Sequence, residues 1–172
     1  MILTRIAHED VPYSDNIFQS GFWAAFRNAG RTEARGFALD HRGGRTPLVV
    51  LLRTASSGER YAYVPRGPHA GLEECDVGPF LEELAEKLRA ELPEKLACVR
   101  FDTEFPSPFT DSEYWAANGQ WRGAPRTELR ELRMNFGTRT RALRKAAVDH
   151  LCPDTVIVDL RGSEEMILAR MR

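Results

Sequence analysis

The feature that most constrains the fold is the run Leu-Ala-Cys-Val-Arg-Phe-Asp at residues 96–102. Side chains alternate between the two faces of a strand, so Arg100 and Asp102 share one face at the end of an otherwise apolar strand. A half-buried charge is costly unless it is paired. One interpretation is an Arg–Asp pair that only terminates the strand. The other is a carboxylate presented to a cleft, because ligand sites in mixed α/β sheets often lie beyond strand ends.

The rest of the first hundred residues predicts a sheet with flanking helices. Apolar residues recur at three- and four-residue steps in residues 20–30 and 77–92, which predicts two helices. Short turn-rich segments separate three of the strand-like runs, which is typical of an antiparallel meander. Four runs before residue 96 have the composition of strands: residues 3–6, 35–40, 48–54 and 60–64. We therefore expect an α+β fold, with a mixed sheet and flanking helices.

The two helices carry different side chains. In the first, Phe22, Trp23 and Phe26 are expected to form the buried stripe, and Arg27 follows Trp23 by four residues, where an apolar face meets water. In the second, the charged residues between positions 82 and 89 are expected to form a solvated face.

Composition indicates a globular chain with no overall attraction for polyanions. The 172 residues are 42% hydrophobic and 28% charged, with a net charge of −1. A contact with nucleic acid would therefore need a local basic patch. Residues 122–145 contain eight basic residues and only two acids, Glu128 and Glu131. This stretch is either a solvated loop or a segment that meets phosphates.

Cysteines, histidines and hydropathy limit the other classes of function. The three cysteines and four histidines lack the spacing of metal ligands, so we expect no metal site and a reducing compartment. The longest apolar run, residues 47–52, is too short to span a membrane. The expected location is the cytoplasm, at most peripheral to the inner face of the membrane.

The turn Pro65-Arg66-Gly67-Pro68 follows the last strand of the meander. A glycine between two prolines allows a sharp turn with a free amide, beside an arginine suited to a phosphate or carboxylate. A rigid turn without a ligand explains the motif equally well.

Four segments resemble, in order and approximate spacing, the FemABX family. These peptidyltransferases use aminoacyl-tRNA to add amino acids to the peptide of a peptidoglycan precursor. The segments cover nearly the whole chain, although none is specific alone. They are Asn16-Ile17-Phe18-Gln19-Ser20-x-x-Trp23, Tyr63-Val64-Pro65-Arg66-Gly67-Pro68, Val99-Arg100-Phe101-Asp102 and residues 152–160.

The resemblance implies two GNAT-like acyltransferase domains that face a substrate cleft. Residues 1–151 would form the first domain, with a basic loop or insert at about 103–151, and residues 152–172 would begin a second, truncated one. Another domain or chain would pack on residues 156–172, and Met166, Ile167 and Met171 would be partly exposed without it. The expected partners are a nucleotide- or lipid-linked muropeptide and aminoacyl-tRNA, which serves as co-substrate with no further cofactor.

The resemblance also assigns roles to residues. Asp102 matches a carboxylate regarded as a candidate base, and Arg27 stands where the family has a lysine that binds the diphosphate of the precursor. The substrate-binding residues would be Trp23, Arg27, Arg66, Gly67 and Arg100. Two departures weaken the match: Thr103 replaces the proline usual after the aspartate, and Cys152 stands where the family often has glutamine.

Two alternatives stay open. One is an acyl-CoA-dependent N-acyltransferase of the wider GNAT group, although its pyrophosphate-binding turn has only near matches, at residues 27–32 and 120–125. The other is a non-catalytic carrier-binding fragment, because a cleft that needs two domains would leave 172 residues able to bind but not to turn over.

Overall fold

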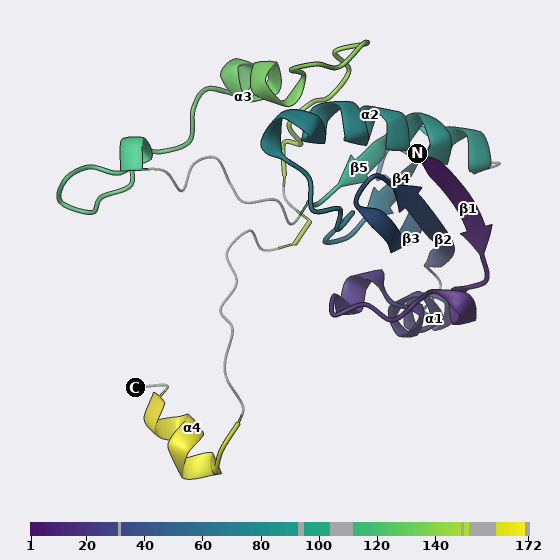
Figure 1. Ribbon diagram of the computed structural model, residues 1–172, viewed down its shortest axis with the longest axis horizontal. Helices are drawn as coiled ribbons and strands as arrows, with labels where there is room; N and C mark the ends of the chain where they lie inside the picture. Colours follow the sequence, from purple (N-terminus) through teal and green to yellow (C-terminus); the bar gives the residue numbers. More distant parts are fainter. Residues whose placement is uncertain (31, 93–94, 104–111, 149, 152–160, 171–172) are drawn as a thin grey trace.

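The computed structural model describes residues 1–172 except 31, 93–94, 104–111, 149, 152–160 and 171–172. Its centre is a five-stranded sheet in the order β1-β2-β3-β4-β5 (Figure 1). The first four strands are antiparallel neighbours, and β4 and β5 are parallel. The expected α+β fold, a mixed sheet with flanking helices, is confirmed. The strands are β1 (Ile2–Ile6), β2 (Glu33–His41), β3 (Gly44–Thr54), β4 (Arg60–Val64) and β5 (Val99–Phe101).

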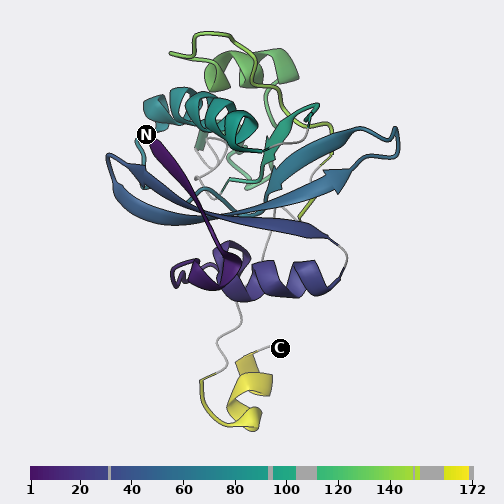
Figure 2. The ribbon, with the colours of Figure 1, turned by 90° about the vertical axis from the view of Figure 1, so that its right-hand side faces the viewer.

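The helices α1 (Gly21–Ala29) and α2 (Glu74–Glu91) lie on opposite faces of this sheet (Figure 2). The α2 face is a continuous apolar core, in which Leu84 and Leu88 are fully buried against Phe37, Leu39 and other strand residues. The α1 face has a smaller apolar centre that includes Ala24, Val49 and Leu51. Two short 3-10 helices, η1 (His8–Asp10) and η2 (Ile17–Gln19), precede α1.

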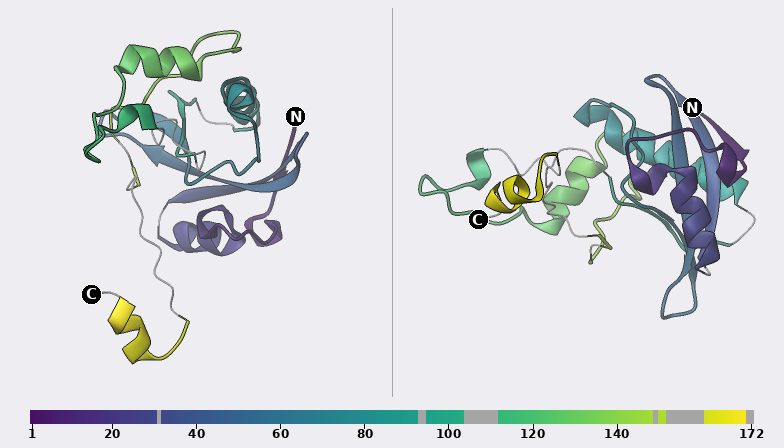
Figure 3. Two further views of the ribbon diagram at one scale, coloured as in Figure 1. Left: turned by 60° about the vertical axis from the view of Figure 1, so that its left-hand side comes forward. Right: turned by 90° about the horizontal axis from the view of Figure 1, so that it is seen from below.

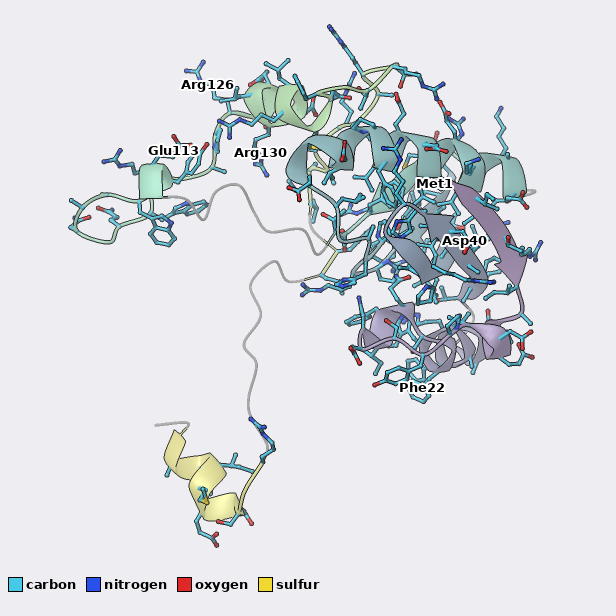
Figure 4. All side chains as sticks on the ribbon, viewed as in Figure 1. Met1, Phe22, Asp40, Glu113, Arg126 and Arg130 are labelled. Atoms are coloured by element: carbon cyan, nitrogen blue, oxygen red, sulfur yellow. The ribbon has the colours of Figure 1, made fainter. Side chains whose placement is uncertain are left out.

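The predicted buried stripe of α1 is wrong for two of its three residues. Phe22 and Phe26 are 70% and 56% exposed, and their rings stack on each other on the outer side of the helix (Figure 4). Ala24 is fully buried and Trp23 half-buried. At 100° per residue, positions 22 and 26 lie on the side opposite Ala24, so the helix turns its small residue to the sheet.

The helix and strand that lead to Asp102 differ slightly from the predicted bounds. Helix α2 begins at Glu74, three residues before the predicted start, and includes Pro79. Strand β5 is shorter than the predicted run, but hydrogen bonds between Ala97 and Arg60 and between Ala62 and Cys98 continue the pairing before it. Asp102 therefore lies immediately beyond the end of a paired strand.

The basic stretch is not simply a loop, because it contains a helix that docks on α2. Helix α3 (Thr127–Met134) lies outside α2 (Figure 3), and the short helix η4 (Ser112–Tyr114) precedes it. The following segment donates to Glu82 through the backbone N–H groups of Arg139 and Thr140, both at 2.8 Å, and through the Thr140 hydroxyl. Glu82 is consequently 7% exposed, so the prediction of a solvated face is wrong at this position.

The last described helix, α4 (Glu164–Arg170), carries exposed apolar residues. Met166 and Leu168 are 52% and 54% exposed, and Ile167 is partly exposed. This agrees with the exposure predicted for Met166 and Ile167. Met171 and the predicted segment 152–160 lie outside the described residues. No helix in the described part of the chain is long and apolar enough to cross a membrane.

Candidate functional site

Three of the four motif segments converge where β4 and β5 end. The Asp102 backbone N–H donates to the Val64 carbonyl at 3.0 Å, and the Gly67 N–H donates to the Asp102 carbonyl at 2.8 Å. The turn after β4 is therefore joined to the residue after β5. The Gly67 amide, predicted to be free for a ligand, is used within the chain. Arg66 precedes it with a backbone φ of 46°.

The segment before α1 holds the same turn from the other side. The Gln19 side-chain amide donates to the Pro65 carbonyl, and its oxygen accepts the Val49 N–H at 2.7 Å. Strands β3 and β4 lose their pairing at this point because proline has no N–H to donate. Gln19 is 1% exposed and bridges the resulting gap. Asn16 likewise donates to the Arg66 carbonyl.

The Asp102 carboxylate is held by two neighbours. The Tyr63 hydroxyl donates to Asp102 Oδ2, and Arg100 Nε lies 3.7 Å from Oδ1. The side chains of Arg100 and Asp102 are 17% and 18% exposed, so the pair is shielded but reachable from solvent. Burial, followed by the hydrogen bond to Asp102, raises the pKa of Tyr63 above its usual value. Tyr63 therefore remains a proton donor to Asp102 at neutral pH.

Cationic and aromatic groups surround this carboxylate. The Arg53 guanidinium lies 5.6 Å from the centre of the Tyr63 ring. The His150 ring stacks on Tyr61 at 6.0 Å and meets Tyr63 edge-on at 5.0 Å. Burial, together with the positive charges of Arg100 and Arg53, lowers the pKa of His150. We call this group the Asp102 cluster, which comprises Arg53, Tyr61, Tyr63, Arg100, Asp102 and His150.

The strands explain why the cluster forms. Tyr61 and Tyr63 alternate with Ala62 and Val64, which point into the core under α2. Antiparallel pairing sets Arg53 opposite Tyr61, and parallel pairing sets Tyr63 opposite Arg100. Because α1 packs mainly on β2 and β3, the β4–β5 end of its face is left to these polar side chains.

Trp23 and Arg27 lie on the same side of the sheet as the cluster. Trp23 packs against the buried group that includes Tyr63. The Arg27 guanidinium lies 5.6 Å from the centre of the Trp23 ring and donates to Thr32 at 3.0 Å. Among the described residues, no hydrogen bond or ion pair joins Arg27 to Asp102. The two predicted site residues share a face without direct contact.

Two of the predicted site residues keep hydrogen-bond donors without a partner on this face. Within the part of the chain that the structure describes, Trp23 Nε1 and Arg27 Nε are buried and make no hydrogen bond. Arg100 Nε makes no hydrogen bond either, but it lies 3.7 Å from Asp102 Oδ1. A buried donor without a partner carries a desolvation cost that a bound acceptor would relieve. These donors, with the Arg53 guanidinium, make this face polar and partly cationic.

Sequence reasoning missed several members of the cluster. The alternation in β4 could have indicated that Tyr61 and Tyr63 share the face of Asp102, once the parallel pairing with β5 was assumed. Nothing near His150 in the sequence indicates its contact with β4. A separate surface hollow of about 410 Å³ is lined by Arg5, His8, Asn28 and Arg35, among others, and contains none of the predicted site residues.

Neither a metal site in the described ranges nor a known relative was found for this chain. The described residues contain no group of three or more His, Cys, Asp or Glu side chains arranged to hold a metal ion. Comparisons of the chain with models of known protein families, with curated proteins and with solved structures found no match.

Proposed function

We propose that this chain is the carrier-binding, amine-activating part of an aminoacyltransferase of the FemABX kind, with a GNAT-like fold. It would help to move an amino acid from aminoacyl-tRNA to the peptide amine of a peptidoglycan precursor. The observation that carries the proposal is the convergence of three sequence segments on Asp102. Asn16 and Gln19 hold the turn at residues 65–68, and that turn is bonded to Asp102.

The sheet supports a GNAT-like interpretation. Its antiparallel strands are followed by a helix and a parallel last pair, which is the layout expected of half of such a domain. The carboxylate then lies beyond the end of a strand, where ligands of mixed sheets often bind. Because one fold serves many functions, the assignment depends on the side chains at this edge.

The chemistry requires orientation, a proton acceptor and positive charge. A lysine-like acceptor amine, with a pKa near 10.4, is neutral in roughly one molecule in a few thousand at pH 7. In our proposal the Asp102 carboxylate takes one proton from the ammonium group, and the neutral amine then attacks the ester carbonyl of aminoacyl-tRNA. The new C–N bond forms, the C–O bond to the ribose breaks, and the second proton lost by the nitrogen passes to the ribose oxygen, which leaves as a hydroxyl.

The cations of this face have distinct proposed roles. Arg27, next to the Trp23 ring, would contact the diphosphate of the carrier, since a guanidinium binds phosphate in a bidentate way. Arg66 would bind the same anionic carrier beside the turn. Arg100, paired with Asp102, would keep that carboxylate ionised and oriented for the amine.

An acyl-CoA-dependent transferase is less well supported. Such enzymes bind pyrophosphate at a helix N-terminus. Helix α2 follows β4 and has Glu73 at its N-cap and Asp76 in its first turn. These acids would repel a pyrophosphate. Calorimetric titration with coenzyme A tests the point, and micromolar binding would favour the acyl-CoA reaction.

The test of the proposal is single-turnover transfer by the full-length gene product. Asp102→Asn keeps the shape of the side chain and removes the base, so transfer should slow by about 10²- to 10⁴-fold. The matched control is Asp40→Asn, because Asp40 is an exposed acid of β2 that lies 3.8 Å from Arg45. Unchanged transfer in Asp102→Asn would remove Asp102 from the reaction.

A further inference from the structure

The outer surface of α3 exposes a stripe of large apolar side chains. Leu129, Leu132 and Phe136 are 43%, 68% and 71% exposed. Their spacing of three and four residues sets them along one side of the helix and the turn after it. Helix α3 is the outermost layer on its side of the molecule, outside α2 (Figures 2 and 3). Exposed apolar clusters are where a protein can contact a partner or a membrane.

The end of α3 lies against α2, which leaves the stripe on the outer side of the helix. A Cβ atom added to Gly78 of α2 would lie 2.3 Å from the Met134 carbonyl oxygen, which shows how closely the end of α3 approaches α2. The Asn135 side chain donates to the carbonyls of Glu131 and Leu143 and accepts the Leu143 N–H. The stripe is therefore exposed while the end of α3 is in contact with α2.

The charge beside the stripe is positive. By helical spacing, Arg126, Arg130 and Arg133 follow one edge of it. Figure 4 labels Arg126 and Arg130 on this helix, and Arg133 donates to the Tyr114 hydroxyl at 2.8 Å. Of the two acids of α3, Glu131 accepts the Lys145 N–H and lies 3.8 Å from Arg144, which removes it from the outer surface. Glu128 lies at the far edge from the arginines. The outer surface thus combines apolar side chains with a flank of guanidinium groups.

We infer that this surface, the α3 face of Arg126, Leu129, Arg130, Leu132, Arg133 and Phe136, binds the surface of an anionic phospholipid bilayer. The leucines and the phenylalanine would enter the boundary between head groups and acyl chains, and the arginines would contact lipid phosphates. The apolar side chains thus match the acyl-chain region of the bilayer, and the arginines match its layer of phosphate head groups. This inference does not depend on the proposed function.

The composition of the face disfavours two other partners. A second copy packed antiparallel through the same patch would bring its arginines against those of the first. A single-stranded nucleic acid would use several aromatic stacking platforms, whereas of the three apolar residues only Phe136 has a π face. Exposed leucines beside arginines are best matched by lipid.

The experiment is co-sedimentation of the 172-residue chain with vesicles that contain no precursor. We expect binding to vesicles of equal parts phosphatidylglycerol and phosphatidylcholine, and little binding to pure phosphatidylcholine. The double variant L132S/F136S should reduce partitioning by at least about tenfold. Arg126→Gln should reduce it about fivefold, and added salt should weaken the binding of the unaltered chain.

The matched controls are Phe22→Ser and Arg45→Gln. Phe22 is as exposed as Phe136 but lies on α1, and Arg45 is an exposed arginine of β3. Neither control should change vesicle binding, and circular dichroism should show each variant folded. The inference is overturned by equal binding to both vesicle types, by no binding, or by loss in Phe22→Ser instead. It is also overturned if a concentration-dependent dimer, or an RNA oligonucleotide complex insensitive to L132S/F136S, uses this face.

Discussion

The two faces of the five-stranded sheet are covered in different ways. Under α2, Leu84 and Leu88 are fully buried against Phe37 and Leu39, and the core is continuous. Under α1, the apolar centre is small, and the β4–β5 end carries Tyr63, Arg100 and Asp102. The α2 face therefore supplies most of the hydrophobic stabilisation. Because of this, the α1 face can hold charged groups near solvent.

The largest expected effect separates these two faces. Leu84→Ala removes a fully buried side chain from the α2 face and should lower the free energy of unfolding by about 2–5 kcal/mol. Phe22→Ala, on the outer side of α1, should change it by no more than about 0.5 kcal/mol. Urea unfolding of both variants measures the difference. Equal losses would mean that α1 is covered in solution and that the comparison is wrong.

The next effect concerns the Gln19 side chain, which bridges β3 and the turn after β4. Gln19→Leu would leave the Val49 N–H and the Pro65 carbonyl buried without partners. The expected loss of unfolding free energy is about 1–3 kcal/mol. Gln120→Leu is the control, since Gln120 is exposed. If both variants unfold at the same urea concentration as the unaltered chain, the Gln19 bridge does not hold the turn at residues 65–68.

A more local effect concerns the hydrogen bonds that join Glu82 of α2 to Arg139 and Thr140, in the segment after α3. The Thr140 hydroxyl and the two backbone N–H groups lower the pKa of Glu82 to about 2. Because the folded pKa lies below the unfolded value, this contribution is present above pH 4.5 and is lost as the pH falls through about 2. At pH 3.5 the amides of Arg139 and Thr140 should stay protected from hydrogen exchange. Glu82→Gln should lose that protection, whereas Glu91→Gln should retain it.

The smallest effect concerns His150, which packs on the rings of Tyr61 and Tyr63. Its lowered pKa means that the neutral contact with Tyr61 and Tyr63 is intact above pH 6.5 and is lost as the pH falls through the folded value. An NMR titration of the His150 ring should give a midpoint below 6.5. Arg53→Gln should move that midpoint upward, because a positive neighbour is removed. A midpoint at or above 6.5 would show that His150 is not packed on β4.

Local patterns in the sequence predicted most of the fold. Apolar runs bounded by turn residues located all five described strands, and the spacing of apolar residues located α1, where the Trp23 N–H donates to the Ser20 hydroxyl at 3.2 Å. The same patterns did not show which side of a short helix is covered, so Phe22 and Phe26 were assigned to the core. Helix α3 was missed because arginines dominate its composition.

Contacts between distant residues could not be predicted in this way. Glu82 was assigned to solvent because its partners, Arg139 and Thr140, are more than fifty positions away. Asp102 was identified as a candidate by its place at a strand end. Its hydrogen bond with Tyr63 depends on the parallel pairing of β4 with β5, which α2 brings about across 34 residues of chain between the two strands.

The most direct test of the account is calorimetric titration of the chain with a nucleotide-linked muropeptide. We predict saturable binding that weakens at least about tenfold in Arg27→Gln and in Arg100→Gln, since each removes a cation from the face that carries Asp102. Arg45→Gln, which alters an exposed arginine far along β3, should bind as the unaltered chain does. Absence of binding, or equal weakening in all three variants, would contradict the claim that this face receives a phosphorylated carrier.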